Sequence, residues 1–228
     1  MPQTLRLRTR VKFCGFVRPA DVDAAASLGA DAVGFVFYPR SPRAVDAAEA
    51  VRLRRRLPSW VAAVGLFVDE APARVLQVVG EVGLDVVQFH GNETPDGCRA
   101  SLPAGLPFWR AVRMRGAGDL LESERLYPGA EAFLVDSFSE KFGGSGTRFD
   151  WSWIPQDRGG RLILSGGLDE ASVGDAIAAV SPDMVDVSSG IQGVDPRTKD
   201  PDRMARFIAA VTQADACRIP QPPTPHRA

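Results

Sequence analysis

Two residues that could do chemistry stand at the ends of apolar runs. Cys14 closes the run VKFC and is followed at once by glycine, and Asp136 closes the run AFLVD. An ionised thiol is a reactive group, and a carboxyl group whose pKa is raised by burial can act as an acid near neutral pH. Each also has a structural interpretation. Free cysteine commonly serves as a small buried hydrophobe, and an aspartate in such a position commonly caps a helix or forms an ion pair.

Short Ser/Gly segments follow two further apolar runs. Residues 165–167 (SGG) come after the run at 162–164, and residues 188–190 (SSG) come after the run at 184–187. Glycine lets backbone N–H groups come close to an anion, and a helix that starts beside them adds a favourable dipole. Either segment alone is typical of a tight turn. Two of them, at the ends of adjacent strands, predict a phosphate site.

Other polar residues carry weaker signals. Arg43 follows the second apolar run and His90 follows the fourth, although a lone histidine is more often structural than catalytic. Asp186 lies inside the last run, where a structural hydrogen bond is at least as good an interpretation. The segment 143–146 (GGSG) lacks the GxxxxGK[ST] pattern of an ATP-binding loop. Its two remaining interpretations are a mobile lid and a plain connector.

Composition excludes several classes of site. The chain has 228 residues and 2 histidines, one of them near the C-terminal end, so a two-histidine metal site is not expected. It contains neither a GxSxG nor a GxGxxG sequence. The formal net charge of -1 gives no indication of nucleic-acid or anionic-membrane binding. Catalysis without a metal or a nucleotide then has to come from Cys14, Asp136 and their neighbours.

Cysteine usage and hydropathy predict a soluble cytoplasmic protein. The 3 cysteines are far apart and form no CxxC pair, which suits a reducing compartment. The first ten residues are basic without an apolar stretch, unlike a secretory signal. No run approaches the roughly 18 apolar residues of a membrane-spanning helix. The arginine-rich segment 52–56 is interpreted as a solvated helix face.

An alternation of strand and helix patterns must position these residues. Strands are predicted at 10–14, 31–37, 61–67, 84–89, 108–112, 132–135, 162–164 and 184–187. Several are continuously apolar, as in AVGFVF, which is typical of parallel strands covered on both faces. Candidate helix caps or first residues are Pro19, Asp46, Pro72, Asp169 and Pro201. The segment 150–153 is too short for a full helix, so the sixth connection is predicted to be irregular.

Eight βα units in just over 200 residues predict the α/β class and a single (β/α)₈ TIM barrel with a parallel eight-stranded core, rather than an open doubly wound sheet. In such a barrel chemistry belongs at the carboxyl ends of the strands, where Cys14, Asp136 and the Ser/Gly segments would meet. Residues 1–215 are predicted to form this catalytic domain. Residues 216–228, rich in proline, are predicted to form a disordered tail.

Seven segments together resemble the phosphoribosylanthranilate isomerase family. They are KFCGFVRPADV, GADAVGFVFYPRSPR, VGLFVDE, VVQFHGNE, LVDSFSEKFGGSGTRFDW, LILSGGL and VDVSSGI, in the family's order, between about residues 11 and 210. The resemblance implies a (β/α)₈ barrel that needs no cofactor or metal. It would convert N-(5-phosphoribosyl)anthranilate to 1-(2-carboxyphenylamino)-1-deoxyribulose 5-phosphate by an Amadori rearrangement in tryptophan biosynthesis. The expected partner is this small phosphorylated aminosugar, with no nucleic acid, membrane or obligate protein partner.

The resemblance also implies roles for single residues. The cysteine of the family's KxCG motif falls on Cys14, the general base, and the aspartate of the sixth strand falls on Asp136, the general acid. The arginine of the FYPxSxR motif falls on Arg43, which would bind the anthranilate carboxylate. His90 and Asp186 match positions in the family's substrate pocket. The phosphate would be held by Gly166, Gly167, Ser188, Ser189 and Gly190.

An Amadori rearrangement needs an acid and a base on opposite sides of the sugar. The acid protonates the ring oxygen so that the furanose opens to a protonated Schiff base, the base removes the C2 proton, and the enolamine tautomerises to the ketone. A free thiol has a pKa of about 8.5, so Cys14 must be partly ionised to act as the base. Lys12, two residues earlier, points to the same side of the strand, and its positive charge is expected to favour the thiolate.

Two alternatives stay open beside this prediction. A related isomerase of histidine biosynthesis has the same barrel and the same rearrangement, but it has an aspartate where this chain has Cys14. A catalytically silent phosphate-binding barrel would not need an acid and a base. The chain also departs from the family in its loops, because Gln192 replaces the usual acidic residue of SSGVE and Arg148 stands near a position where many members have lysine. These changes bear on rate more than on reaction type.

Overall fold

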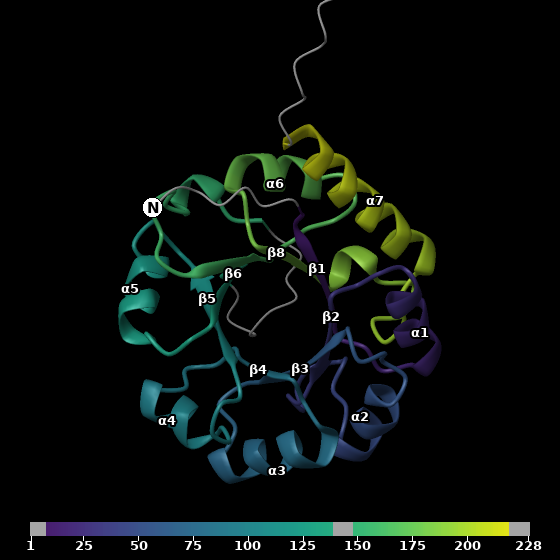
Figure 1. Cartoon of the computed structure of the whole chain (residues 1–228), viewed down its shortest axis with the longest axis vertical. Coiled ribbons are helices and arrows are strands. Elements are labelled where there is room, and N and C mark those ends of the chain that lie inside the picture. The colour runs from purple at the N-terminus through teal and green to yellow at the C-terminus, as the bar shows by residue number, and fades with distance from the viewer. Residues whose placement is uncertain (1–7, 139–147, 219–228) are drawn as a thin grey trace, which may run out of the picture.

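Eight parallel strands close into a barrel in the computed structural model, which describes residues 8–138 and 148–218. The strands follow one another around the barrel in sequence order, and β8 pairs with β1 (Figure 1). They are β1 (Arg10–Cys14), β2 (Ala32–Val36), β3 (Ala62–Phe67), β4 (Val86–Phe89), β5 (Phe108–Met114), β6 (Ala132–Ser137), β7 (Arg161–Leu164) and β8 (Met184–Val187). The predicted (β/α)₈ barrel is confirmed.

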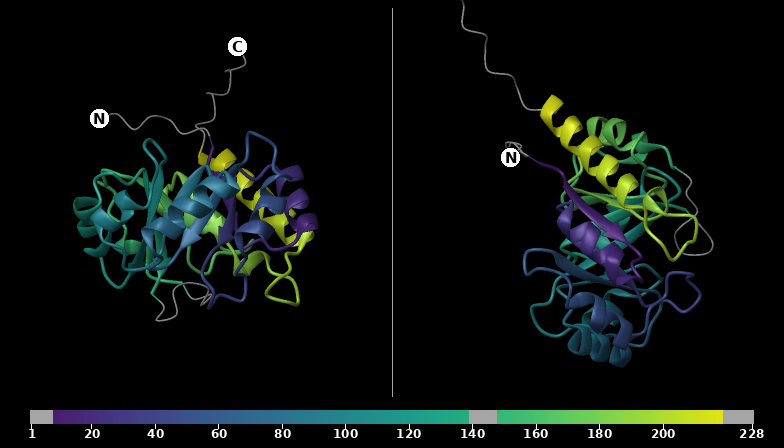
Figure 2. Two further views of the ribbon diagram at one scale, coloured as in Figure 1. Left: turned by 90° about the horizontal axis from the view of Figure 1, so that it is seen from below. Right: turned by 90° about the vertical axis from the view of Figure 1, so that its right-hand side faces the viewer.

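Helices form a ring outside the strands. They are α1 (Pro19–Ser27), α2 (Ala47–Arg54), α3 (Pro72–Val82), α4 (Pro95–Ala100), α5 (Asp119–Leu126), α6 (Val173–Val180) and α7 (Pro201–Arg218). Within the described part of the connection after β6 there is only the short 3₁₀ helix η1 (Trp151–Trp153), in line with the predicted irregular connection, and η2 (Ser189–Ile191) follows β8. The long helix α7 lies between α6 and α1 (Figures 1 and 2).

Local side-chain bonds decide where two of the helices begin. Asp46 caps α2: its carboxylate accepts the Glu49 N–H at 2.7 Å, and the Glu49 carboxylate accepts the Asp46 N–H at 2.9 Å, which is a capping box. Asp169 was expected to precede a helix directly, but α6 begins only at Val173. The Asp169 carboxylate instead accepts the Ser172 N–H at 2.9 Å and closes a turn ahead of the helix.

Successive side chains along each strand point alternately to the helices outside the barrel and to the barrel interior, and so belong to two separate cores. In β1, Val11 and Phe13 face the helices, where the Phe13 ring lies 6.0 Å from the Phe207 ring of α7. Lys12 and Cys14 face the inside of the barrel, as the period of two predicts. The apolar filling of the interior consists of Ala32, Val64, Val86, Trp109, Ala111, Ala132, Leu134, Ile163 and Met184. Polar side chains such as Cys14 and Asp136 therefore lie next to this apolar layer, at the carboxyl ends of the strands.

Two strands extend past their predicted carboxyl ends, and this changes the position of Asp136. β5 continues to Met114 and β6 continues to Ser137, with Arg113 opposite Asp136 in the parallel register. Asp136 therefore lies within a hydrogen-bonded strand rather than in the loop after it. Its backbone is held by the sheet on one side, which restricts the direction of its side chain.

The end of the chain differs from the prediction by three residues. Helix α7 continues to Arg218, so residues 216–218, assigned to the disordered tail, are helical. The first proline of the tail is Pro220, and nothing before it stops the helix. Asp215 ties this last turn to the barrel, because its carboxylate accepts the Thr9 hydroxyl at 2.7 Å. Residues 219–228 and the GGSG segment at 143–146 lie outside the described residues.

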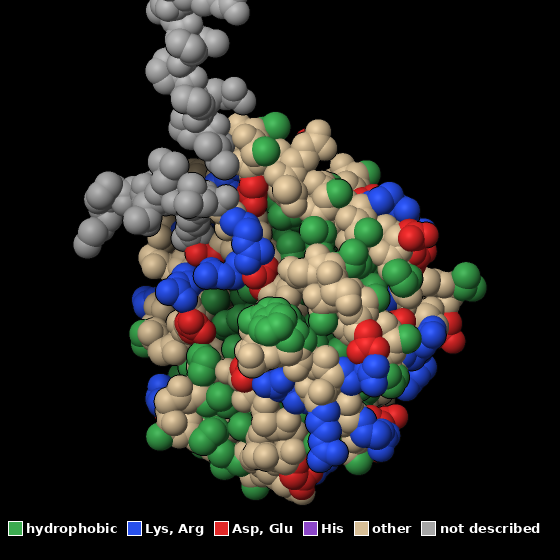
Figure 3. Space-filling view, turned by 45° about the vertical axis from the view of Figure 1, so that its right-hand side comes forward, with side chains coloured by type: hydrophobic (Ala, Val, Ile, Leu, Met, Phe, Trp, Pro, Cys, Tyr) green, Lys and Arg blue, Asp and Glu red, His purple; other side chains and the backbone are tan. Residues whose placement is uncertain are grey.

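The surface carries charges of both signs. Arg54 pairs with Asp85 at 3.2 Å and Arg56 pairs with Asp23, so arginines of the 52–56 segment bind acidic residues of neighbouring units. On the face drawn in Figure 3, basic and acidic side chains are interspersed. Across the ranges that the structure describes, none of the helices combines the length and the apolar character needed to span a membrane.

Candidate active site

A pocket opens at the carboxyl ends of the strands, where the sequence predicts the chemistry. Every predicted site residue except Gly190 lines it. These are Cys14, Arg43, His90, Asp136, Gly166, Gly167, Asp186, Ser188 and Ser189. They come from β1, β6 and β8 and from the segments after β2, β4, β7 and β8, so residues up to 175 positions apart in the sequence share one cavity.

Lys12 connects Cys14 to Asp186 inside the barrel. Its side chain is fully buried, and its Nζ donates to Asp186 Oδ1 at 2.7 Å. Burial lowers the pKa of the Lys12 ammonium, but the Asp186 carboxylate and the Cys14 side chain raise it, and the net pKa lies above its ordinary value. Lys12 is therefore a fixed cation beside Cys14. Ser165 completes the group by donating its hydroxyl to Asp186 Oδ2 at 3.1 Å.

Two glycines make room for the thiol and for the neighbouring arginine. Gly15 has a φ of +82° and ends β1 in a turn, as the sequence suggests; a Cβ there would lie 2.6 Å from Arg43 Cδ. At Gly34 of β2 a Cβ would lie 2.8 Å from Cys14 Sγ. A side chain at either position would displace a residue of the pocket, so both glycines permit close approach, and at Gly15 the positive φ also favours glycine.

Asp136 presents one oxygen to the cavity. Its Oδ1 accepts the Ser137 N–H at 2.8 Å, while its Oδ2 lies 3.5 Å from His90 Nε2. Gly166, with a φ of +90°, passes behind the carboxylate, and a Cβ there would lie 3.2 Å from Asp136 Oδ1. The carboxyl group is thus fixed through Oδ1, which leaves Oδ2 as the oxygen that can exchange a proton with a bound molecule.

Gln88 orients the His90 ring. The two side chains are buried, and Gln88 Nε2 lies 3.0 Å from His90 Nδ1. We assign the Gln88 amide as the donor and Nδ1 as the acceptor, which places the imidazole proton on Nε2, facing Asp136. Among the described residues, Gln88 Oε1 and His90 Nε2 have no hydrogen-bond partner. Buried polar atoms without partners, aimed into a pocket, are the atoms that a polar ligand would satisfy.

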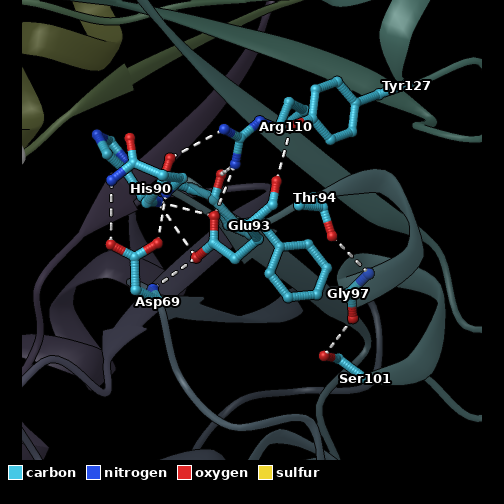
Figure 4. A network of polar contacts seen from close by, with 12 residues as sticks. Asp69, His90, Glu93, Thr94, Gly97, Ser101, Arg110 and Tyr127 are labelled. Atoms are coloured by element: carbon cyan, nitrogen blue, oxygen red, sulfur yellow. Dashed lines mark hydrogen bonds and ion pairs between the residues drawn. The ribbon is translucent and has the colours of Figure 1, made fainter.

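A buried ion pair holds the loop that carries His90 (Figure 4). Glu93 accepts Arg110 Nη1 at 2.7 Å and the Gly91 N–H at 2.9 Å, while Arg110 Nη2 donates to the Gly91 carbonyl at 2.9 Å. Glu93 also accepts the Asp69 N–H at 2.8 Å, and its carbonyl accepts the Tyr127 hydroxyl at 2.7 Å. These bonds join the loops after β3 and β4 to β5, and they fix the position of His90.

The Ser/Gly segments meet at the β7–β8 side of the pocket. Gly166 and Gly167 both have positive φ, at +90° and +64°, which glycine adopts without strain. Ser188 donates its hydroxyl to the Cys14 carbonyl at 2.9 Å and so joins the end of β8 to the end of β1. Gly190 has a different place. A Cβ there would lie 2.1 Å from the Leu168 carbonyl oxygen, so this glycine lets the two segments pack together behind the pocket.

Some residues of the site are not predicted from the sequence. Tyr38, Ser41 and Gln88 also line the pocket, and Lys199 lies under it, with its Nζ donating to the Ser188 carbonyl at 2.9 Å. Gln88 carried a usable signal, because it is the polar residue in the apolar run VVQF and shares a strand face with His90. Within the described ranges no cluster of three or more His, Cys, Asp or Glu residues could hold a metal ion.

The fold and this pocket define a (β/α)₈-barrel enzyme whose strand ends bring together a thiol, a carboxyl group, cationic side chains and two Ser/Gly segments. Residues 11–210 match the family of N-(5'phosphoribosyl)anthranilate (PRA) isomerase. The chain belongs to this family.

Relatives and solved structures agree with the match. The chain is 48% identical over 210 residues to an N-(5'-phosphoribosyl)anthranilate isomerase of Methylibium petroleiphilum, covering 92% of this chain and 97% of that protein. The crystal structure of phosphoribosyl anthranilate isomerase from Thermotoga maritima is 39% identical and superposes with a TM-score of 0.83 over 90% of this chain and 99% of that chain. A second crystal structure, at 37% identity and a TM-score of 0.79, covers 90% and 98% and holds reduced 1-(o-carboxyphenylamino)-1-deoxyribulose 5-phosphate.

Proposed function

We propose that the chain isomerises N-(5'-phosphoribosyl)anthranilate with Asp136 as the acid and Cys14 as the base. The reaction itself, a step of tryptophan biosynthesis, follows from the family. Asp136 gives a proton to the furanose oxygen, and the ring opens to a protonated Schiff base. Cys14 takes the C2 proton, and the enolamine that results tautomerises to the ketone product. The observation that carries the proposal is that Cys14 and Asp136, on β1 and β6, line one pocket.

The pocket offers separate groups for the two anionic ends of the substrate. We assign the phosphate to the backbone of Gly166, Gly167, Ser188 and Ser189, where positive-φ glycines expose N–H groups. Arg43 also lines the pocket, with its guanidinium beside Gln192, and takes the anthranilate carboxylate. Binding both ends stretches the aminosugar between Cys14 and Asp136. Gly190 supports the phosphate loop from behind.

Asp186 and His90 act mainly by holding other groups. Both Asp186 oxygens already have partners, Lys12 and Ser165, so Asp186 keeps the Lys12 ammonium in place beside Cys14. His90 keeps its Nε2 proton directed at Asp136. From there it can bond to a substrate oxygen or to Asp136 after proton transfer.

Gln192 offers a test of the assigned role of Arg43. Arg43 Nη1 donates to the neutral Gln192 Oε1 at 3.2 Å, which leaves the arginine charge free to pair with a carboxylate. In Gln192→Glu the new carboxylate would compete with the substrate for Arg43. We expect KM to rise by about twofold to fivefold with kcat nearly unchanged, the size of a partly exposed ion pair. Steady-state kinetics would measure both.

Gln77→Glu is the matched control for this change. Gln77 accepts Arg74 Nη1 at 3.0 Å on the exposed face of α3, so the same Arg–Gln pair exists away from the pocket. KM should not change in this variant. An equal rise in KM in both variants would mean that added negative charge, rather than competition at Arg43, causes the effect.

The activity can be tested with the purified chain and substrate generated in situ. The anthranilate-type fluorescence of the substrate should decay in the presence of the protein. No decay would favour the silent phosphate-binding barrel. Decay with only the aminosugar phosphate of histidine biosynthesis would favour the related isomerase. We also infer a cytoplasmic location, because Cys14, Cys98 and Cys217 are all free thiols, as suits a reducing compartment.

A further inference from the structure

Lys199 is a buried cation under the phosphate loop, and the mechanism above does not use it. It is 4% exposed, and its Nζ donates to the Ser188 carbonyl at 2.9 Å and lies 3.4 Å from the Ser188 hydroxyl. Among the described residues, no carboxylate forms an ion pair with this ammonium. Buried charges are normally paired, so a buried ammonium bonded only to neutral oxygens is placed for an anion that comes from outside.

The bond from Lys199 fixes a peptide group that faces the pocket. In a trans peptide the C=O of one residue and the N–H of the next point in opposite directions. Because the Ser188 carbonyl is directed at Lys199, the Ser189 N–H is directed away from it, and both serines line the pocket. Ser189 opens the short helix η2, so its N–H has no partner within that helix.

Lys199 is itself anchored from a second element. Its backbone N–H donates to the buried Asp21 carboxylate of α1 at 3.0 Å, and its ammonium lies 5.6 Å from the centre of the Phe16 ring. The lysine side chain therefore has a defined direction rather than the freedom of a surface lysine. A positive charge held against a carbonyl oxygen polarises the whole peptide and makes its N–H a better donor.

We propose that Lys199 is a positioning residue for the substrate phosphate, which aims and polarises the Ser189 N–H and supplies the buried positive charge that balances the bound dianion. This inference rests on the proposed phosphate site. Lys199 does not touch the reacting atoms in it. Its effect belongs to binding and therefore to KM.

The charge of Lys199 is sensitive to its surroundings. Burial lowers the pKa of its ammonium to about 7; Arg43 acts in the same direction, whereas the negative charges of Cys14, Asp186 and Asp21 oppose it. An arriving dianion favours the protonated form. Anion binding should therefore take up a proton near neutral pH, and anion affinity should fall as the pH rises through this titration.

Sulfate is a suitable probe, because it remains a dianion across the range in which Lys199 titrates. Its affinity can be measured by calorimetry from about pH 6 to about pH 9 at constant ionic strength. For the wild-type protein we expect affinity to fall by about tenfold over this range. Lys199→Met should bind sulfate about tenfold more weakly at the low end and show a smaller dependence on pH, while KM rises and kcat is nearly kept.

Two further variants distinguish the effect of a charge at position 199 from the effect of the protein's overall charge. Lys199→Arg keeps a cation that stays charged over this pH range, so sulfate affinity should be retained and its dependence on pH reduced. This variant tests the role of Lys199 even where Lys199→Met does not fold. Arg203→Met removes an exposed charge in the first turn of α7, the helix that begins shortly after Lys199, and should behave like the wild type. Cys14 and His90 are unchanged in every variant, so a difference from the wild type comes from the substituted residue.

The outcomes distinguish this inference from the proposed function. Wild-type affinity and an unchanged pH slope in the Lys199 variants would overturn the role of Lys199 and leave the phosphate site standing. Failure of sulfate to bind the wild-type protein, or to compete with substrate, would overturn the phosphate site and the role of Lys199 together.

Discussion

Replacing Cys14 with alanine is expected to lower kcat by about two to four orders of magnitude, the range found when a general base is removed. The variant lacks the sulfur that we propose takes the C2 proton, so the Schiff base should form without being converted. Lys12 and Asp186 keep their bond, because neither depends on the sulfur for its partner. Rates from the fluorescence decay and unfolding midpoints from circular dichroism would measure activity and fold separately.

Cys98→Ala is the matched control for this loss. Cys98 is buried like Cys14, but it lies in α4 and does not line the pocket. Burial raises the pKa of its thiol to about 11, so this sulfur stays protonated near neutral pH and cannot serve as a base. Its variant should keep the wild-type kcat. A Cys14→Ala protein with near-normal turnover would remove Cys14 from the role of base.

The fold follows from the sequence because its signals are local. Apolar runs, helix caps and the spacing of βα units depend on neighbours within a few residues. The capping box at Asp46 and the irregular connection at residues 150–153 show this. The strand ends were harder to predict, since the extra residues of β5 and β6 stabilise one another across the sheet, with Arg113 opposite Asp136. Pairing between strands is not visible in one strand's pattern.

The residues of the site were predicted better than their partners. Alternation placed Lys12 on the same face as Cys14, but it could not show that Asp186, 174 residues away, holds the Lys12 ammonium. The charge of Lys12 is therefore shared between Asp186 and the thiol rather than directed at Cys14 alone. The place of Lys199 depends on how the loop after η2 returns to Ser188, and no local pattern around Lys199 predicts that.

Replacing Asp136 with asparagine is expected to lower kcat by about two to four orders of magnitude, with KM changed far less. Asparagine has the same shape, and its Oδ1 can still accept the Ser137 N–H, which lies 2.8 Å from the present carboxylate oxygen. The amide has no acidic proton for the ring oxygen, so the furanose stays closed. Binding should be little affected, because the proposed contacts to the phosphate and the carboxylate come from other residues. Steady-state kinetics with the substrate generated in situ would measure the change.

Two comparisons show whether the loss in Asp136→Asn is chemical. Asp175→Asn, an exposed aspartate in the first turn of α6, removes one negative charge from the surface and should leave kcat unchanged. The reduced product analogue needs no ring opening, so Asp136→Asn should bind it about as tightly as the wild type does. Weak binding of the analogue would show that asparagine disturbs the pocket through His90 or Gly166. Turnover close to that of the wild type would mean that another group, with His90 the nearest candidate at 3.5 Å from the carboxylate, gives the ring oxygen its proton.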